Sequence, residues 1–194
     1  MESIFTLPYP EYAVATLFQK NFKKGDDYSI QIPLSRQQKG IDLLLYHQKT
    51  KRAVSLQIKS SRSWYGRPPK RKSRKEKFEY YAWFRSFNYQ KGLADFYVFF
   101  ILYPKNDLGS KKLDKNRDIK KWWNSKVVIF NDNEIGQLLK QIKTKEGKPE
   151  KFFGFGFNEK SDDIVLTRGL GEHVSFKENL FENKIKEIKK NLHK

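Results

Sequence analysis

The pattern that most constrains the fold lies in residues 40–61, which read GIDLLLYHQKTKRAVSLQIKSS. Residues 41–47 and 53–59 are rich in apolar and β-branched side chains, and the polar segment 48–52 between them has the length of a hairpin loop. Side chains of a strand alternate between its two faces, so each run has one apolar face and one polar face. The segment therefore predicts an antiparallel hairpin with its apolar face in a core.

The polar face of this hairpin carries three residues of interest. Asp42 opens the first strand, and Gln57 and Lys59 lie two residues apart on the second. A pairing in which the apolar faces coincide brings all three side chains to one surface. An edge hairpin with a solvated polar face has the same pattern, so the spacing leaves both interpretations open.

This constellation resembles the core of the PD-(D/E)xK nuclease superfamily, which includes many restriction endonucleases and Holliday-junction resolvases. Here Ile41-Asp42 takes the place of Pro-Asp, and Gln57-Ile58-Lys59 takes the place of (D/E)-x-K, with Gln in place of the acidic residue. Some members of the superfamily carry that variant. The resemblance covers about the first half of the chain. It implies an α/β protein with a restriction-endonuclease-like core, in which helices flank a central mixed β-sheet.

The resemblance also implies a metal-dependent endonuclease. Its Mg²⁺ ligands would be Asp42, the Gln57 amide oxygen or the Ile58 carbonyl, and Glu11, all hard oxygen ligands. The ion would polarise the scissile phosphate and activate a water molecule, and Lys59 would orient that water or stabilise the transition state. Because Gln57 carries no charge, we expect weak Mg²⁺ binding and activity with Mn²⁺.

Glu11 lies in a segment that predicts the first helix, residues 9–22, which is entered through Pro10. Glu11 heads the apolar stripe of that helix, formed by Val14, Ala15, Phe18 and Phe22. A carboxylate at this position either completes the metal site, as the resemblance implies, or only stabilises the start of the helix. The sequence leaves both roles open.

The charge balance indicates the partner. The chain has 40 Lys and Arg residues against 22 Asp and Glu residues, a formal net charge of +18. Such an excess favours a polyanionic partner, with nucleic acid first and an anionic membrane surface second. There is no cysteine, and no apolar run has the length of a membrane span or forms a signal peptide. We therefore expect a cytoplasmic protein that binds double-stranded DNA and no membrane.

Residues 61–77, SRSWYGRPPKRKSRKEK, combine two adjacent prolines with a cluster of cations and predict a mobile basic loop. Aromatic residues at its start suit stacking on bases beside phosphate contacts. A solvated charge run or a localisation tag has the same composition. Two more cations precede Asp42. The candidate nucleic-acid contacts are Arg36, Lys39, Arg62, Trp64, Arg67, Lys70, Arg71, Lys72, Arg74 and Lys75.

The rest of the chain fits one domain over residues 1–194. Predicted elements are a strand at 28–34, a second hairpin made of 78–87 and 94–104, a strand at 126–130, a helix from Asn131 or Asp132 to Gly147, strands at 151–157 and 163–167, and a closing helix from Phe176. The sequence has no P-loop, no HExxH motif and no Ser-His-Asp arrangement.

Two other functions remain open. A non-catalytic nucleic-acid-binding module would keep the fold but, through Gln57, bind metal too weakly to cut. A basic interaction protein would dock on RNA or an acidic partner. If both strands of a duplex are cut at one site, a two-fold homodimer is expected. The recognition sequence, the choice between DNA and RNA, and the biological role are not encoded in these motifs.

Overall fold

The computed structural model describes residues 9–33, 40–65, 78–85, 87, 89–104, 123–143, 146–150, 152–167 and 174–194. The α-helices of this part of the chain are α1 (Tyr9–Asn21), α3 (Asp132–Gln141) and α4 (Phe181–His193), with short 3-10 turns at Lys24–Asp26 and Lys177–Asn179. The strands are β1 (Tyr28–Gln31), β2 (Leu43–His47), β3 (Arg52–Tyr65), β4 (Tyr80–Phe84), β5 (Phe96–Pro104), β6 (Trp123–Asn131), β7 (Phe153–Phe157) and β8 (Ile164–Leu166).

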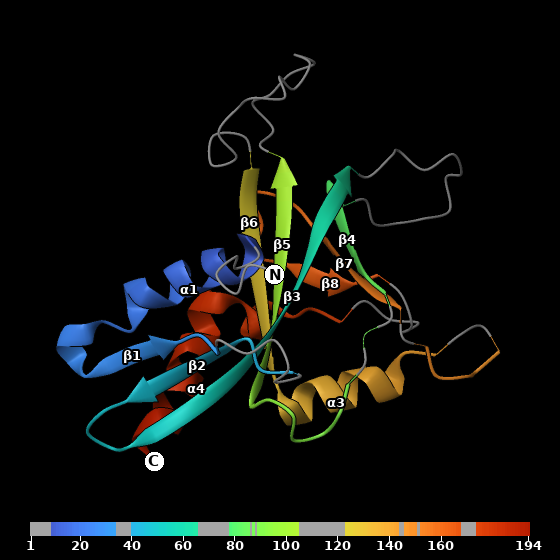
Figure 1. Ribbon diagram of the computed structural model, residues 1–194. Coiled ribbons are helices and arrows are strands. Elements are labelled where there is room, and N and C mark those ends of the chain that lie inside the picture. The colour runs from blue at the N-terminus through green and yellow to red at the C-terminus, as the bar shows by residue number, and fades with distance from the viewer. Residues whose placement is uncertain are drawn as a thin grey trace, which may run out of the picture.

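The eight described strands form a mixed, mostly antiparallel sheet in two portions. In the main sheet β1, β2 and β3 form an antiparallel meander, β5 pairs with β3 in parallel, and β6 pairs with β5. In the second sheet the far end of β3 pairs with β4, which continues through β7 to β8. The long strand β3 thus belongs to both portions, which diverge from it (Figure 1).

The predicted hairpin is confirmed. Leu43 pairs with Leu56 and Leu45 pairs with Val54, and all four side chains are buried. The apolar faces of the two strands therefore coincide, as the alternation required. β3 does not stop at the predicted Lys59 but continues to Tyr65.

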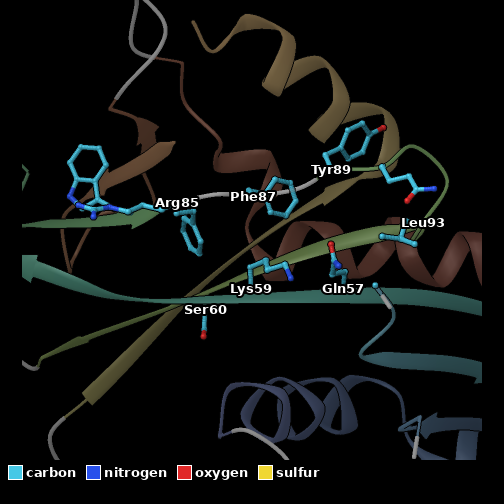
Figure 2. A pocket seen from close by; sticks show the side chains of 11 residues that line it. Gln57, Lys59, Ser60, Arg85, Phe87, Tyr89 and Leu93 are labelled. Carbon is cyan, nitrogen blue, oxygen red and sulfur yellow. The ribbon is translucent and has the colours of Figure 1, made fainter. Parts of the chain in front are cut away.

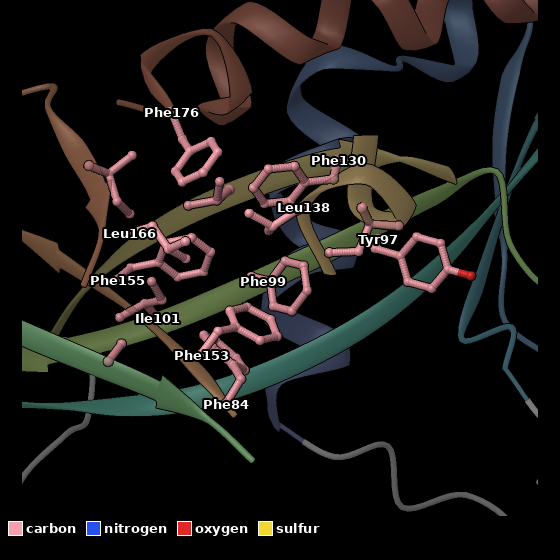
Figure 3. Packing of buried hydrophobic residues seen from close by; sticks show 14 of the residues in the cluster. Phe84, Tyr97, Phe99, Ile101, Phe130, Leu138, Phe153, Phe155, Leu166 and Phe176 are labelled. Carbon is pink, nitrogen blue, oxygen red and sulfur yellow. The ribbon is translucent and has the colours of Figure 1, made fainter. Parts of the chain in front are cut away.

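β5 is buried on both faces, which explains its continuous apolar run. Tyr97, Phe99 and Ile101 belong to a core between the main sheet, the second sheet and α3, whose aromatic rings are shown in Figure 3. Phe96, Val98 and Phe100 belong to a second core, which α1 and α4 cover. The molecule therefore has three layers, with the main sheet in the middle (Figure 1).

α1 and α3 begin close to where the sequence places them, whereas the closing helix α4 begins at Phe181 and not at the predicted Phe176, because Lys177–Asn179 form a separate 3-10 turn. α1 spans Tyr9–Asn21, against a predicted 9–22. α3 starts after Asn131, whose side chain accepts a hydrogen bond from the Glu134 amide (2.9 Å) while the Glu134 carboxylate accepts one from the Asn131 amide (2.9 Å). α3 ends at Gln141, earlier than the predicted Gly147, because Ile142 is already extended.

The second predicted hairpin is wrong. β4 does not pair with β5; it pairs with the end of β3 and with β7, while β5 lies parallel to β3. Both runs were correctly identified as strands, but their partners depend on contacts distant in sequence. The start of the predicted basic loop is also wrong, because 61–65 belong to β3 and pair with β4. Residues 66–77 of that loop lie outside the described residues.

Candidate functional site

A cavity of about 570 Å³ opens where the second sheet leaves the main sheet (Figure 2). One wall is β3, and the other is the end of β4 with the irregular segment that connects it to β5. The lining residues are Gly40, Gln57, Lys59, Ser60, Trp83, Phe84, Arg85, Phe87, Tyr89, Gln90 and Leu93. Its volume lies in the range of small-molecule sites in proteins.

Gln57 and Lys59 project from β3 into this cavity, toward Phe87 and Tyr89 (Figure 2). Gln57 is only 6% exposed, and its Oε1 is buried without a hydrogen-bond partner in the part of the chain that the structure describes. A buried acceptor left unpaired costs about 1–3 kcal/mol. Groups of this kind in a native fold often belong to functional sites.

Asp42 directly precedes β2 and is tied to β3 by two hydrogen bonds. Its amide donates to the Leu56 carbonyl (2.8 Å), and its Oδ2 accepts from the Ile58 amide (2.6 Å). Since the Ile58 amide lies between Gln57 and Lys59 in the chain, this second bond holds the carboxylate beside both residues. Asp42 does not itself line the cavity.

The charges at the site are Asp42 and, within the cavity, the cations of its lining. Burial raises the pKa of the Asp42 carboxyl, while the Ile58 amide and the positive charge of Lys59 act in the opposite direction without cancelling it. Within the cavity the described lining holds two cations, Lys59 and Arg85, and no carboxylate. A cation at Asp42 and an anion such as phosphate in the cavity would both be favoured.

The wall opposite β3 was not identified from the sequence. Arg85, Phe87 and Tyr89 lie in the connection between β4 and β5. The predicted hairpin places Arg85 and Phe87 at the end of its first strand and Tyr89 in its loop. Tyr89 donates a hydrogen bond to the Asp132 carbonyl (3.1 Å), and burial raises the pKa of its phenol. The sequence signal that could have indicated this wall is an arginine close to two aromatic residues in a short segment between two strands.

The structure does not bring Glu11 to the cavity. Glu11 lies on α1, whose residues Val14 and Phe18 pack into the core on the other face of the main sheet, and Glu11 is not a lining residue. Ile58 is buried in that same core, and its amide is the donor to Asp42. Metal ligation by the Ile58 carbonyl stays a prediction.

The predicted nucleic-acid contacts are placed only in part. Arg62 is exposed on β3, three residues beyond Lys59, and Trp64 lies in the stretch of β3 that pairs with β4. The other predicted contacts fall outside the described residues: Arg36, Lys39, Arg67, Lys70, Arg71, Lys72, Arg74 and Lys75. Their contacts with DNA stay predictions.

The donor set at the site suits an ion with few protein ligands. Among the described residues no cluster of three or more His, Cys, Asp or Glu side chains could hold a metal ion. Mg²⁺ needs no such cluster, because it is commonly held by one or two carboxylates, water and substrate phosphates. Asp42 and the amide oxygen of Gln57 fit this arrangement.

Comparison of the chain with models of protein families, with characterised proteins and with solved structures found no match in any of the three. None of the helices that the structure describes has the length and apolar character needed to cross a membrane. The functional argument therefore depends on the geometry of the site.

Proposed function

We propose that this protein is a metal-dependent endonuclease that hydrolyses phosphodiester bonds, with DNA as its substrate. The observation that carries the proposal is the 2.6 Å hydrogen bond from the Ile58 amide to Asp42 Oδ2. It joins the Asp at the start of one strand to the Gln-x-Lys of the next, so three residues named from sequence spacing meet beside one cavity. A solvated edge hairpin needs neither this bond nor a buried Gln57 whose Oε1 has no hydrogen-bond partner among the described residues.

Asp42 and Gln57 are the residues that would hold Mg²⁺ or Mn²⁺. Such an ion supplies a Lewis acid for the phosphate and lowers the pKa of bound water. The Ile58 amide keeps the Asp42 carboxylate in place before any ligand binds, which reduces the cost of organising the site. The neutral Gln57 contributes an oxygen without charge, so millimolar Mg²⁺ or a preference for Mn²⁺ is expected.

Lys59 and Arg85 would act on the substrate. Lys59 lines the cavity from β3, and Arg85 lines it from the segment after β4, with its guanidinium over the Phe152 ring and its side chain pointing away from Lys59 (Figure 2). A phosphate in the cavity would meet Lys59, and a phosphate at the rim would meet Arg85. Lys59, whose positive charge acts on the Asp42 carboxylate, would stabilise the negative charge that develops on the phosphate during hydrolysis. The formal net charge of +18 favours the approach of a polyanion.

A second candidate is a nucleic-acid-binding module of the same fold without catalysis. The observation that favours it is that the described residues offer no cluster of three metal-binding side chains. Asp42 would then be a partly buried carboxylate that ties the start of β2 to β3, and Lys59 a phosphate contact. The two candidates differ in one measurable property, which is cleavage that depends on added metal.

The test is incubation of supercoiled plasmid with the purified protein at low salt, with Mg²⁺, with Mn²⁺ and with EDTA. We expect conversion to nicked or linear DNA with either metal and none with EDTA. Asp42→Asn and Lys59→Ala should abolish cleavage, while the exposed Asp26→Asn and Lys160→Ala should cut like the wild type. Gel shifts in EDTA measure binding separately.

Two results would contradict the nuclease proposal. Cleavage by Asp42→Asn equal to that of the wild type would mean that Asp42 is not part of the active site. Plasmid binding without cleavage at any concentration of either metal would favour the non-catalytic module.

A further inference from the structure

A row of aromatic side chains lies on the outer face of the second sheet. β4 alternates strictly: Tyr80, Ala82 and Phe84 are buried in the core between the two sheets, so Tyr81 and Trp83 face outward. Phe152 directly precedes β7 and lies on the same outer side. We call Tyr81, Trp83 and Phe152 the aromatic row.

The rings of the aromatic row are nearly parallel. The centroids of Tyr81 and Trp83 are 6.4 Å apart with an interplanar angle of 9°, and those of Trp83 and Phe152 are 5.2 Å apart with an angle of 27°. All three side chains are partly exposed. The Arg85 guanidinium lies 5.3 Å from the centroid of Phe152 and ends the row with a positive charge.

Glycines on the neighbouring strand make room for these rings. Gly154 pairs with Trp83 and Gly156 pairs with Tyr81. A Cβ at Gly154 would overlap the Trp83 ring and lie 2.7 Å from the Ala82 carbonyl oxygen. The sequence FGFGF therefore places phenylalanines in the core and no side chain on the outer face, so that Trp83 lies directly over the β7 backbone.

The aromatic row is continuous with the cavity. Trp83 and Arg85, which belong to the row or flank it, also line the cavity that holds Gln57 and Lys59. Trp83 and Arg85 therefore connect the row to the rim of the cavity, which Lys59 lines from β3.

We propose that the aromatic row is a stacking platform for unpaired nucleotides, so that the substrate is a single strand or the single-stranded part of a DNA that also contains duplex. This inference rests on the proposed function, and it specifies the substrate class. Bases stack on exposed aromatic rings with little dependence on sequence, and each stacked base contributes about 1–3 kcal/mol. The bases of an intact duplex are already stacked on one another and cannot reach the row.

The charge of the protein favours this occupant over an apolar peptide. The row is flanked by Arg85, which also lines the cavity that holds Lys59, and the chain carries a formal net charge of +18. Parallel rings beside cations suit alternating bases and phosphates, whereas a peptide would gain nothing from that charge unless it were acidic.

The test uses the full chain in EDTA, so that no cleavage occurs, with a fluorescent oligothymidylate and a hairpin duplex of equal length as probes. We expect tighter binding of the single strand by the wild type. Tyr81→Leu and Trp83→Leu keep apolar volume but remove a ring, and each should weaken binding of oligothymidylate by about 5-fold to 150-fold, from 1–3 kcal/mol per base. Trp83→Phe should retain most of the affinity.

Tyr12→Leu is the matched control, because Tyr12 is an aromatic residue that is 60% exposed on α1. It should bind both probes like the wild type. If Trp83→Leu does not fold, judged by its melting curve, Tyr81→Leu decides the result. Unchanged affinity of folded Tyr81→Leu and Trp83→Leu for oligothymidylate, or an equal loss for single strand and duplex, overturns the platform.

The platform and the nuclease can fail separately. If Tyr81→Leu and Trp83→Leu bind oligothymidylate normally while Asp42→Asn abolishes metal-dependent cleavage of plasmid, the nuclease stands and the platform is wrong. If the two aromatic variants lose affinity for the single strand while Asp42→Asn still cuts, the platform stands and Asp42 is not the catalytic carboxylate.

Discussion

Replacing Gln57 with Leu should stabilise the fold and abolish activity. Gln57 Oε1 is buried without a hydrogen-bond partner in the described structure, and an unsatisfied acceptor costs about 1–3 kcal/mol. Leu has a similar size and no polar atom, so the substitution removes that cost. For a chain of this length 1 kcal/mol corresponds to about 2–4 °C, which predicts a rise in melting temperature of about 2–12 °C.

Thermal unfolding followed by circular dichroism measures this rise, and urea unfolding checks that the m-value is unchanged. Thr167→Val is the matched control, because Thr167 Oγ1 is also buried without a partner in the part of the chain that the structure describes, but lies outside the cavity. It should stabilise the fold and leave plasmid cleavage intact, whereas Gln57→Leu should eliminate cleavage. A lower melting temperature for Gln57→Leu would refute the reasoning, since it would mean that the fold itself needs the amide.

Three further predictions concern charge, packing and salt. Burial raises the pKa of the Asp42 carboxyl above its ordinary value of 3.8. The contribution of Asp42 to stability is therefore present below pH 3.8 and is lost as the pH rises through the pKa of the folded state. Asp42→Asn should raise the melting temperature at pH 7 and not at pH 3. Gly154→Ala should lower the free energy of unfolding in urea by about 1–3 kcal/mol, because the added Cβ meets the Trp83 ring and the Ala82 carbonyl. Gly25→Ala is the control: its Cβ meets nothing within 4 Å, so the free energy of unfolding should change by less than about 0.5 kcal/mol. DNA affinity should fall with salt with a log–log slope of about 0.9 per neutralised phosphate. Replacing Arg71, Lys72, Arg74 and Lys75 together with Ala should make this slope shallower. A slope equal to that of the wild type would mean that these residues do not contact the DNA.

The hairpin could be predicted because the alternation of apolar and polar side chains along a strand shows which face is buried. Leu43, Leu45, Val54 and Leu56 had to face one core, and this fixed the register of β2 on β3. The start of α3 could be predicted because its cap is local, formed by Asn131 and Glu134. Strand partners are not local.

The pairing of β5 shows why. Its run of apolar residues correctly predicted a buried strand, but a strand buried on both faces is central, and the sequence does not say which neighbours flank it. The nearest strand in sequence, β4, was chosen, and the structure instead places β5 between β3 and β6. The missed wall of the cavity, with Arg85 and Tyr89, follows from that prediction, because the predicted hairpin makes Arg85 part of a strand paired with β5 and Tyr89 part of its loop, whereas β4 ends at Phe84.

The position of the site follows from the length of β3. A strand of 14 residues is longer than either sheet portion needs, so its first part pairs with β2, its middle pairs with β5 and its last part pairs with β4. Gln57 and Lys59 lie on the stretch of β3 between its pairing with β2 and its pairing with β4, and the cavity opens there. β4 must leave β3 at this same point, and its outward residue Trp83 therefore reaches the cavity rim. The polar residues and the aromatic row are brought together by one topological feature, so variants that shorten the pairing of β3 with β4 should impair both cleavage and single-strand binding.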